Sequence, residues 1–310
     1  MKHLFLVNPV AGKGNRLDEF LADIRKHFQG QDYEVKVSQK PGDITSWAKQ
    51  ASQKNQELRV YACGGDGTLN EVVNGVAGCF NVAVTHVARG SGNDFIRLFT
   101  DAAPFHDLES FVKDTREVPV DLIQCNGDYA LNVCSMGFDA RIGTQIAAYK
   151  KLPLVKGQGA YILSAVVNTI KGIHHNYHVE VNGEVVDGEQ TMIYVGSGSW
   201  YGGGFHPVPD ADPTDGILDV LLVKGVSRGT VMKLIGSYKV GKFRDYPHLI
   251  RYFRTKKITV SCEKAEPVNL DGELRMSNKI EISVAPFRLR FFYPGSVCLA
   301  CKERADAIAV

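Results

Sequence analysis

The segment that most constrains the fold of this chain is a glycine-rich turn between a strand-like and a helix-like stretch. Residues 58–63 form a short run of β-favouring composition, and residues 64–67 read Gly-Gly-Asp-Gly. Apolar side chains then recur at helical spacing, at Leu69, Val72, Val73 and Val76. Thr68 and Glu71 have the spacing of a capping box, so we expect the helix to begin at Thr68.

This arrangement predicts a phosphate-binding loop. Glycines before a helix let the backbone turn sharply and bring its N–H groups close to a ligand, and the positive end of the helix attracts an anion. Asp66 is unexpected there, because a carboxylate repels phosphate. We interpret it as an acid that acts through a Mg²⁺ ion or that handles a proton. An ordinary glycine-rich turn would not need an acid between glycines.

The first 120 residues alternate between strand-like and helix-like runs. Strands are expected at residues 3–7, 33–38, 58–63 and 81–88, and helices at 17–28, 41–53, 68–76 and 105–112. Such alternation predicts βαβ units and a parallel sheet covered by helices, whose ligands bind beyond the carboxyl ends of the strands. Three glycine-rich loops follow strands, and we expect them to converge there: residues 8–14, 64–67 and 90–94.

The pattern changes after about Pro119, where short β runs follow one another. Asn126-Gly127 and Asn182-Gly183 lie between such runs, and Asn-Gly is a strong hairpin signal. We expect an antiparallel, β-rich domain of sandwich type, with helices only at residues 161–170 and 228–240. The predicted domains are residues 1–120, with allowance for a return of residues 294–310, and residues 121–293.

The composition is that of a soluble globular protein, with 44% hydrophobic and 23% charged residues. A formal charge of +2 gives no reason to expect nucleic acid as a partner. Seven scattered cysteines indicate free thiols in a reducing compartment. No signal peptide and no membrane-spanning apolar run is evident, so we expect a cytoplasmic protein, with peripheral binding at the inner membrane face left open.

Polar residues in two further loops are candidates for nucleotide binding. Lys13 can reach a phosphate from the first loop, although its spacing is not that of a Walker A motif. In the third loop, Ser91 and its neighbours offer a hydroxyl and an amide to a nucleotide. Asp94 and Arg97 lie three residues apart, a spacing that also suits a plain surface ion pair.

The second half of the chain contains further acids. Asp121 lies in an apolar strand, and we expect a metal, a water or an arginine as its partner, because a buried unpaired acid is costly. The acidic turn at residues 210–219 fails as an EF-hand, which leaves either a cation on Asp215 or a plain turn. Asp271-Gly272 favours a hairpin, and Glu273 can act as a base if it faces the phosphate. Basic and aromatic residues mix at 239–257, which suits an anionic membrane or a solvated face.

Five motifs in this order resemble the diacylglycerol kinase catalytic family, and within it the soluble bacterial lipid kinases. They are residues 8–13, 64–71, 90–97, 214–219 and 271–273. The resemblance implies an α/β N-terminal domain with a doubly wound sheet like that of NAD kinases and phosphofructokinases. It also implies a β-sandwich C-terminal domain. The resemblance covers nearly the whole chain.

The resemblance implies roles for individual residues as well. Asp66, Asp94 and Asp121 would share an acid–water–Mg²⁺ network, and Glu273 would be the general base. ATP would lie against a set of residues from the three loops and their surroundings: Asn8, Pro9, Gly12, Lys13, Ser38, Gly64, Gly65, Asp66, Gly67, Thr68, Leu69, Asn70, Ser91, Asp94, Arg97 and Asp121.

A second, structural Mg²⁺ site is implied by the same resemblance. It would use the carboxylate of Asp215 and the backbone carbonyls of Asp212 and Ile217. Two departures from the family pattern are mild, with Ala11 where Ser is common and Ser91 where Thr is common. Since Ser and Thr both carry a hydroxyl, we still expect ATP to bind.

The leading hypothesis is an ATP- and Mg²⁺-dependent lipid kinase that phosphorylates a hydroxyl of diacylglycerol or a related lipid at a membrane surface. One alternative is a soluble-substrate kinase of the NAD kinase type, which shares residues 64–68 but is disfavoured by the third loop and residues 271–273. Another is a non-catalytic nucleotide or lipid sensor, which would not need a base. The acceptor lipid and a possible homodimer stay open.

Overall fold

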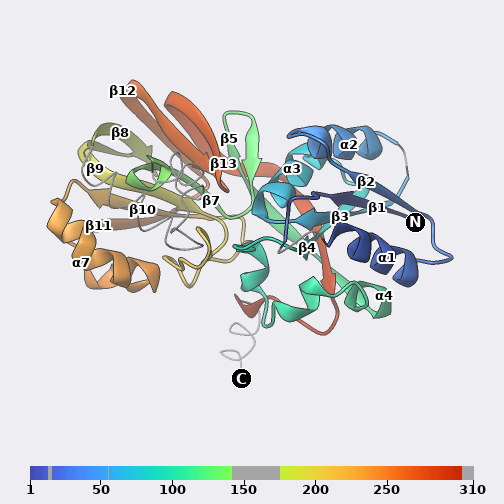
Figure 1. Cartoon of the computed structure of the whole chain (residues 1–310). Helices are drawn as coiled ribbons and strands as arrows, with labels where there is room; N and C mark the ends of the chain where they lie inside the picture. Colours follow the sequence, from blue (N-terminus) through green and yellow to red (C-terminus); the bar gives the residue numbers. More distant parts are fainter. Residues whose placement is uncertain (13–15, 55, 142–174, 302–310) are drawn as a thin grey trace. The chain divides into compact units, whose positions relative to one another are not determined.

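The computed structural model describes residues 1–12, 16–54, 56–141 and 175–301 (Figure 1). The chain divides into two compact units. Unit 1 contains residues 1–122 and the chain from residue 286 onward, and unit 2 contains residues 123–285. None of the helices in the described residues combines the length and the apolar composition of a transmembrane segment.

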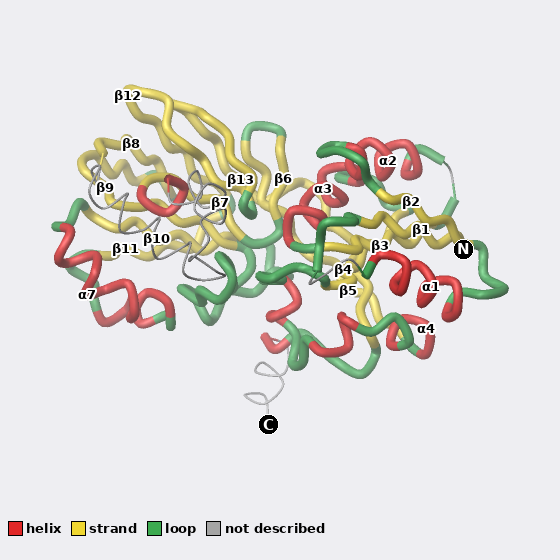
Figure 2. The backbone as a smooth tube through the Cα atoms, viewed as in Figure 1, coloured by secondary structure: helices red, strands yellow, loops and turns green. Residues whose placement is uncertain are grey.

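Unit 1 is built on a parallel sheet with the strand order β4–β3–β1–β2 (Figure 2). Its strands are β1 (Lys2–Val7), β2 (Tyr33–Val37), β3 (Leu58–Gly64) and β4 (Val82–Ala88). The last part of β13 (Glu273–Pro294) adds a further parallel strand, since Arg290 pairs with Ala83 and Phe291 with Val84. Every residue of β4 is buried, as is typical of a parallel strand covered on both faces.

Helices cover both faces of this sheet. They are α1 (Leu17–His27), α2 (Asp43–Ser52), α3 (Asp66–Val76) and α4 (Ser110–Lys113). Figure 1 shows α2 and α3 on one face and α1 and α4 on the other. A Cβ on Gly75 of α3 would lie 2.6 Å from the Cβ of Ala48 on α2, so these helices approach closely. On the opposite face, Tyr61 stacks on Phe5 with 4.2 Å between ring centroids.

One helix of unit 1 was predicted wrongly. Residues 105–112 do not form a single helix but a 3₁₀ turn, η2 (Ala103–His106), followed by the short α4. Asp107 separates the two in an extended conformation, and its carboxylate accepts a hydrogen bond from the N–H of Glu109 at 3.0 Å. An Asp that bonds the nearby backbone in this way favours turns over helix interiors.

Unit 2 is an antiparallel β structure, as expected. Its strands run in the order β11–β10–β9–β7–β12–β13, with β8 paired to both β9 and β12, and the end of β5 (Thr115–Cys125) paired to β6. The strands are β6 (Asp128–Ala130), β7 (Val133–Gly137), β8 (His175–Val181), β9 (Glu184–Gly196), β10 (Leu218–Lys224), β11 (Ile250–Thr255) and β12 (Lys257–Leu270). β11 was not predicted, because its basic residues were interpreted as part of a basic and aromatic surface stretch. The helix expected at residues 161–170 lies outside the described residues.

The central strands of unit 2 are buried on both faces. Successive side chains of a strand point to opposite sides. Ile193 and Val195 of β9 therefore enter one apolar core, whereas Met192 and Tyr194 enter another. The helix α7 (Arg228–Lys239), predicted at 228–240, has no buried residue. Together the two units confirm the predicted combination of an α/β domain with a β-rich sandwich domain.

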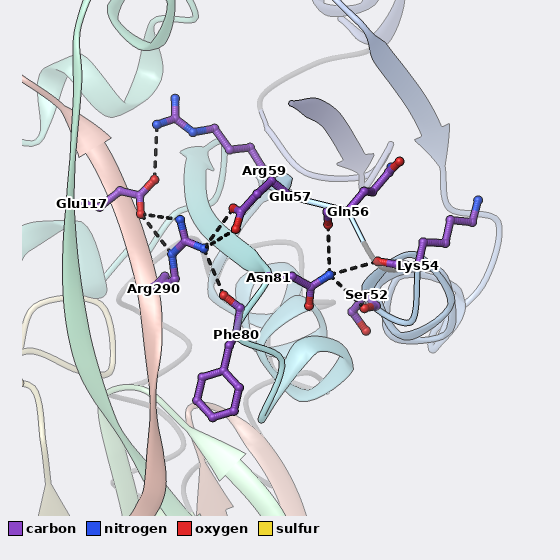
Figure 3. A network of polar contacts seen from close by, with 9 residues as sticks. All are labelled: Ser52, Lys54, Gln56, Glu57, Arg59, Phe80, Asn81, Glu117 and Arg290. Carbon is purple, nitrogen blue, oxygen red and sulfur yellow. Dashed lines mark hydrogen bonds and ion pairs between the residues drawn. The ribbon is translucent and has the colours of Figure 1, made fainter.

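A polar network lies at the amino ends of β3 and β4 in unit 1 (Figure 3). The guanidinium of Arg290 lies 3.0 Å from Glu57 Oε2 and 3.0 Å from Glu117 Oε2. Arg59 Nη2 contacts Glu117 Oε1 at 3.3 Å. Asn81 Nδ2 donates to three backbone carbonyls, those of Ser52, Lys54 and Gln56. We call Glu57, Arg59, Asn81, Glu117 and Arg290 the amino-edge network.

Candidate active site

The loops that follow β1, β2, β3 and β4 lie side by side at the carboxyl edge of the sheet in unit 1. The N–H of Asn8 donates to Cys63 O at 3.0 Å, and the N–H of Arg89 donates to Gly64 O at 2.7 Å. After β2, the N–H of Ser38 donates to Val7 O at 2.9 Å. The three glycine-rich loops therefore meet where the alternating pattern of the sequence placed them.

Contacts between these loops require glycine at several positions. A Cβ on Gly90 would lie 2.5 Å from Gly65 Cα, and a Cβ on Gly92 would lie 2.6 Å from Asp66 Oδ2. A Cβ on Gly64 would collide with the side chain of Thr68. The second and third loops thus touch backbone to backbone, which only residues without a side chain allow.

Asp66 fastens the third loop to the second. It is the first residue of α3, and its Oδ2 accepts a hydrogen bond from Asn93 N at 2.8 Å. Its Oδ1 accepts a second bond from Asp94 N at 2.7 Å. Asn93 itself has φ +51°, and its Oδ1 accepts from Gly90 N at 3.0 Å. Backbone donors therefore hold the carboxylate in a fixed direction.

The expected start of α3 at Thr68 is wrong. The helix begins two residues earlier, with Gly65 in an extended conformation at its N-cap. The hydroxyl of Thr68 accepts a bond from Asn8 Nδ2 at 3.2 Å, which ties the helix to the first loop. Glu71 does not cap its own helix, because its Oε2 accepts from Gly42 N, at the beginning of α2, at 3.1 Å.

Asp66 and Asp94 face a common point. The position that a Cβ on Gly92 would take lies 2.6 Å from Asp66 Oδ2 and 3.7 Å from Asp94 Oδ2. Mg²⁺ in phosphoryl-transfer sites is usually held by one or two carboxylates together with substrate phosphates. The pair fits such an ion, although the described part of the chain contains no cluster of three or more metal-ligating side chains.

Two further charged residues of the predicted site are paired with neighbours. Asp121 is only 1% exposed, and its Oδ1 lies 2.8 Å from Arg288 Nε, an ion pair whose geometry is not that of a hydrogen bond. An arginine was one of the partners expected for it. Arg97 Nη2 donates to Gly92 O at 3.0 Å, and its Nε lies 3.5 Å from Asp94 Oδ1. Arg97 therefore supports the third loop.

The remaining predicted nucleotide contacts differ in accessibility. Ser91 is exposed at the tip of the third loop, whereas Leu69 and Asn70 are buried within α3. Gly12 has φ +105°, which favours glycine in the first loop. Lys13 lies outside the described residues. The buried members of the set support the loops, and the exposed side chain of Ser91 is accessible to a ligand.

Sequence reasoning missed two residues at this edge. His86 of β4 is fully buried, and its Nε2 lies 2.9 Å from Gly64 O. Burial lowers the pKa of His86, against the opposing effect of Asp66, so the ring is neutral and donates to that carbonyl. Arg89 follows β4 directly, with its guanidinium 4.0 Å from the ring centre of Phe20. The position of Arg89, a cation between a buried strand and a glycine-rich loop, is the feature of the sequence that could have indicated a role in the site.

In unit 2, Glu273 stands at the first position of β13 and is exposed. It pairs with Leu270 across a hairpin turn in which Asp271 has φ +51° and Gly272 has φ +96°. This confirms the hairpin expected from Asp-Gly. The carboxylate of Asp271 accepts three backbone N–H bonds, from Leu131 at 2.5 Å, Val133 at 2.8 Å and Asn132 at 3.0 Å. The turn that carries Glu273 is thereby anchored.

The acidic turn of unit 2 is closed by an arginine. Asp215 Oδ1 accepts from Ile217 N at 2.9 Å, and Oδ2 pairs with Arg254. Asp212 Oδ1 accepts from the N–H and the hydroxyl of Thr214. A cation bound by Asp215 would compete with the guanidinium of Arg254, and the implied structural Mg²⁺ site stays a prediction.

The basic stretch at residues 239–257 is partly neutralised within unit 2, since four of its seven Lys and Arg residues pair with acids. Its cations form ion pairs, at 2.5–3.0 Å, between Arg244 and Asp210, Arg251 and Glu184, and Lys257 and Glu281. Arg254 also pairs with an acid, as described above. These contacts reduce the positive charge that the stretch can offer to an anionic surface.

The chain matches two family models. Residues 2–125 match the diacylglycerol kinase catalytic domain, and residues 132–293 match the YegS C-terminal NAD kinase beta sandwich-like domain. A protein of Staphylococcus aureus strain JH9 named "Putative lipid kinase" is 27% identical over 271 residues, or 86% of each chain. One of the same name from Staphylococcus carnosus strain TM300 is 24% identical over 301 residues, or 94% of this chain and 96% of the relative.

A solved structure shares the fold. The crystal structure of a diacylglycerol kinase from Bacillus anthracis strain Sterne superposes with a TM-score of 0.70. The match covers 96% of this chain and 98% of the other at 23% sequence identity. Similarity at this level concerns the architecture.

Proposed function

The chain belongs to the diacylglycerol kinase catalytic-domain family, and on that premise we propose that it is an ATP- and Mg²⁺-dependent lipid kinase. It transfers the γ-phosphoryl group of ATP to a hydroxyl of diacylglycerol or a related lipid. The observation that carries this proposal is the bridge from the Asp66 carboxylate to the N–H groups of Asn93 and Asp94. It joins two glycine-rich loops at the carboxyl edge of a parallel sheet, where ligands of such sheets bind.

The nucleotide phosphates are received by the backbone at the beginning of α3. The first N–H groups of a helix have no partner within it, and the helix dipole adds partial positive charge there. Asp66 and Asp94 would hold Mg²⁺, which when bound neutralises charge on the phosphates. Because Asp66 is oriented by two backbone bonds, the side chain needs little rearrangement when the ion and the nucleotide arrive.

We propose Glu273 as the general base. Its carboxylate has no hydrogen-bond or ion-pair partner among the described residues, and the anchored turn before it fixes its position. It takes the proton from the lipid hydroxyl while that oxygen bonds to the γ-phosphorus. The bond from phosphorus to the bridging oxygen breaks, and ADP leaves.

The lipid acceptor implies that the protein works at a membrane surface, bound peripherally to the inner face. Two exposed apolar side chains on or next to α7 support contact between this helix and the membrane surface. Met232 and Val240, on and just after that helix, are 53% and 56% exposed. A homodimer is compatible with the proposal but is not required by it.

Phosphoryl transfer from γ-labelled ATP tests the function. Purified protein and Mg²⁺ are incubated with micelles of diacylglycerol, monoacylglycerol, phosphatidylglycerol or a sphingoid base, with NAD, or without acceptor. We expect label in an organic-extractable product, lost in Asp66→Asn and kept in Asp18→Asn, an exposed acid on α1. Label only in the NAD tube would indicate a soluble-substrate kinase. ATP binding without any product would indicate a sensor.

A further inference from the structure

Arg89 occupies a special position at the carboxyl edge of unit 1. Its backbone is fixed between the second and third loops, because its N–H donates to Gly64 O at 2.7 Å. Its side chain turns toward the first loop, where Nη2 lies 3.6 Å from the point that a Cβ on Gly12 would take. The ring of Phe20 lies 4.0 Å from the centre of the guanidinium and holds it by a cation–π contact.

The positive charge of Arg89 is not neutralised by a counter-ion among the described residues. No described carboxylate forms an ion pair with it, and its buried Nε has no hydrogen-bond acceptor there. Burial lowers the pKa of the guanidinium from its ordinary value, yet an arginine stays protonated in proteins. By contrast, Arg288 and Arg290 of the same unit each face a carboxylate. A partly buried cation without a counter-ion is costly, and an anionic ligand would remove that cost.

We propose that the guanidinium of Arg89 binds a phosphate group of the nucleotide. A planar guanidinium offers paired donors that match phosphate oxygens, and the loops around it are those that the proposed function assigns to ATP. The inference rests on that function only for the identity of the ligand. Phosphate also occurs on phosphorylated lipids, but Arg89 lies among Gly12, Gly64 and the third loop, so we assign the nucleotide as its source.

Binding measurements without any acceptor test this role. Calorimetric titration with ATP, ADP, AMP and adenosine is compared for the wild type, Arg89→Met, Arg89→Lys and Arg25→Met. Arg25 is an exposed arginine on α1 without an ion pair in the described residues, so its replacement removes the same charge elsewhere. We expect Arg89→Met to weaken ATP binding about 10- to 100-fold and to leave adenosine unchanged. Arg89→Lys should fall between, and Arg25→Met should match the wild type.

Thermal unfolding separates a binding role from a structural one. Arg89→Met removes a partly buried charge that has no counter-ion among the described residues. The melting temperature of the ligand-free variant should therefore equal or exceed that of the wild type. The rise in melting temperature on adding ATP should be smaller in Arg89→Met, because a weaker ligand stabilises less. A lower melting temperature without ligand, together with unchanged ATP affinity, would show that Arg89 is structural and overturn the inference.

Further outcomes are decisive as well. Equal loss of ATP and adenosine binding, or no ATP binding by the wild type, would overturn the assignment. Unchanged ATP binding with weaker retention on vesicles of a phosphate-headed lipid would give the site to the lipid. If the wild type phosphorylates no lipid and yet ATP affinity depends on Arg89, the inference stands and the proposed lipid kinase activity fails.

Discussion

The two edges of the parallel sheet in unit 1 use charge in opposite ways. At the amino edge, Arg290 lies 3.0 Å from both Glu57 and Glu117, so its charge is neutralised by ion pairs with other side chains (Figure 3). At the carboxyl edge, Asp66 is held by backbone N–H groups, and Arg89 has no carboxylate partner among the described residues. The polar side chains of the amino edge stabilise the fold by pairing with one another, whereas polar groups of the carboxyl edge are available to bind a ligand.

The largest effect that we expect concerns the base. Glu273→Gln keeps the size of the side chain and removes its ability to accept a proton. Turnover should fall by about 10²- to 10⁴-fold, while ATP affinity stays that of the wild type. Steady-state kinetics with a lipid acceptor and calorimetric ATP titration measure the two quantities. Wild-type turnover would refute the role of Glu273.

A change at the carboxyl edge should come next. Asp66→Asn weakens the bridge to Asn93 and Asp94 and removes one charge for Mg²⁺, so we expect kcat/KM to fall by about 100-fold or more. The melting temperature should move little, because the bridge lies outside the apolar core. The kinetics and the melting curve of one preparation check both statements. A large loss of stability with normal kcat/KM would contradict the distinction between the edges.

The amino-edge network should show the reverse behaviour. Arg290→Met leaves Glu57 and Glu117 without their shared partner and should lower the free energy of unfolding by about 0.5–1 kcal/mol, because the three side chains are partly exposed. Kinase activity at a temperature well below the transition should stay within about twofold of the wild type. Urea unfolding measures the loss, with Arg116→Met, an exposed arginine of the same unit, as the control. Lost activity in the folded variant would place function at both edges.

A further effect concerns the stability of unit 1 in acid. His3 lies 2.9 Å from the hydroxyl of Tyr61, and burial, with help from Arg59, lowers its pKa to about 4. Between pH about 6.5 and about 4, the unfolded chain therefore binds more protons at His3 than the folded chain does. Stability should fall as the pH drops through that window, and His3→Gln should reduce the slope. A slope equal to the wild type would exclude this histidine as its source.

The sequence predicted what depends on local patterns. The strand–loop–helix order of unit 1 follows from hydrophobic periodicity and glycine, and the hairpin at Asp271 follows from Asp-Gly. The predicted capping role of Glu71 was wrong, because its carboxylate accepts a hydrogen bond from the N–H of Gly42, the N-cap residue of α2. The pairing of Arg254 with Asp215 was not foreseeable either, since the two residues meet only when β10 and β11 pair.

We propose that the carboxyl edge of the sheet binds the nucleotide for phosphoryl transfer to a lipid, whereas the amino edge only stabilises the fold. The most direct measurement compares the initial rate of label transfer from γ-labelled ATP to diacylglycerol micelles by the wild type, Asp66→Asn and Arg290→Met. We expect rates within about twofold of each other for the wild type and Arg290→Met and a rate at least about 100-fold lower for Asp66→Asn. Equal rates for all three proteins, or no labelled lipid from the wild type with any acceptor, would contradict it.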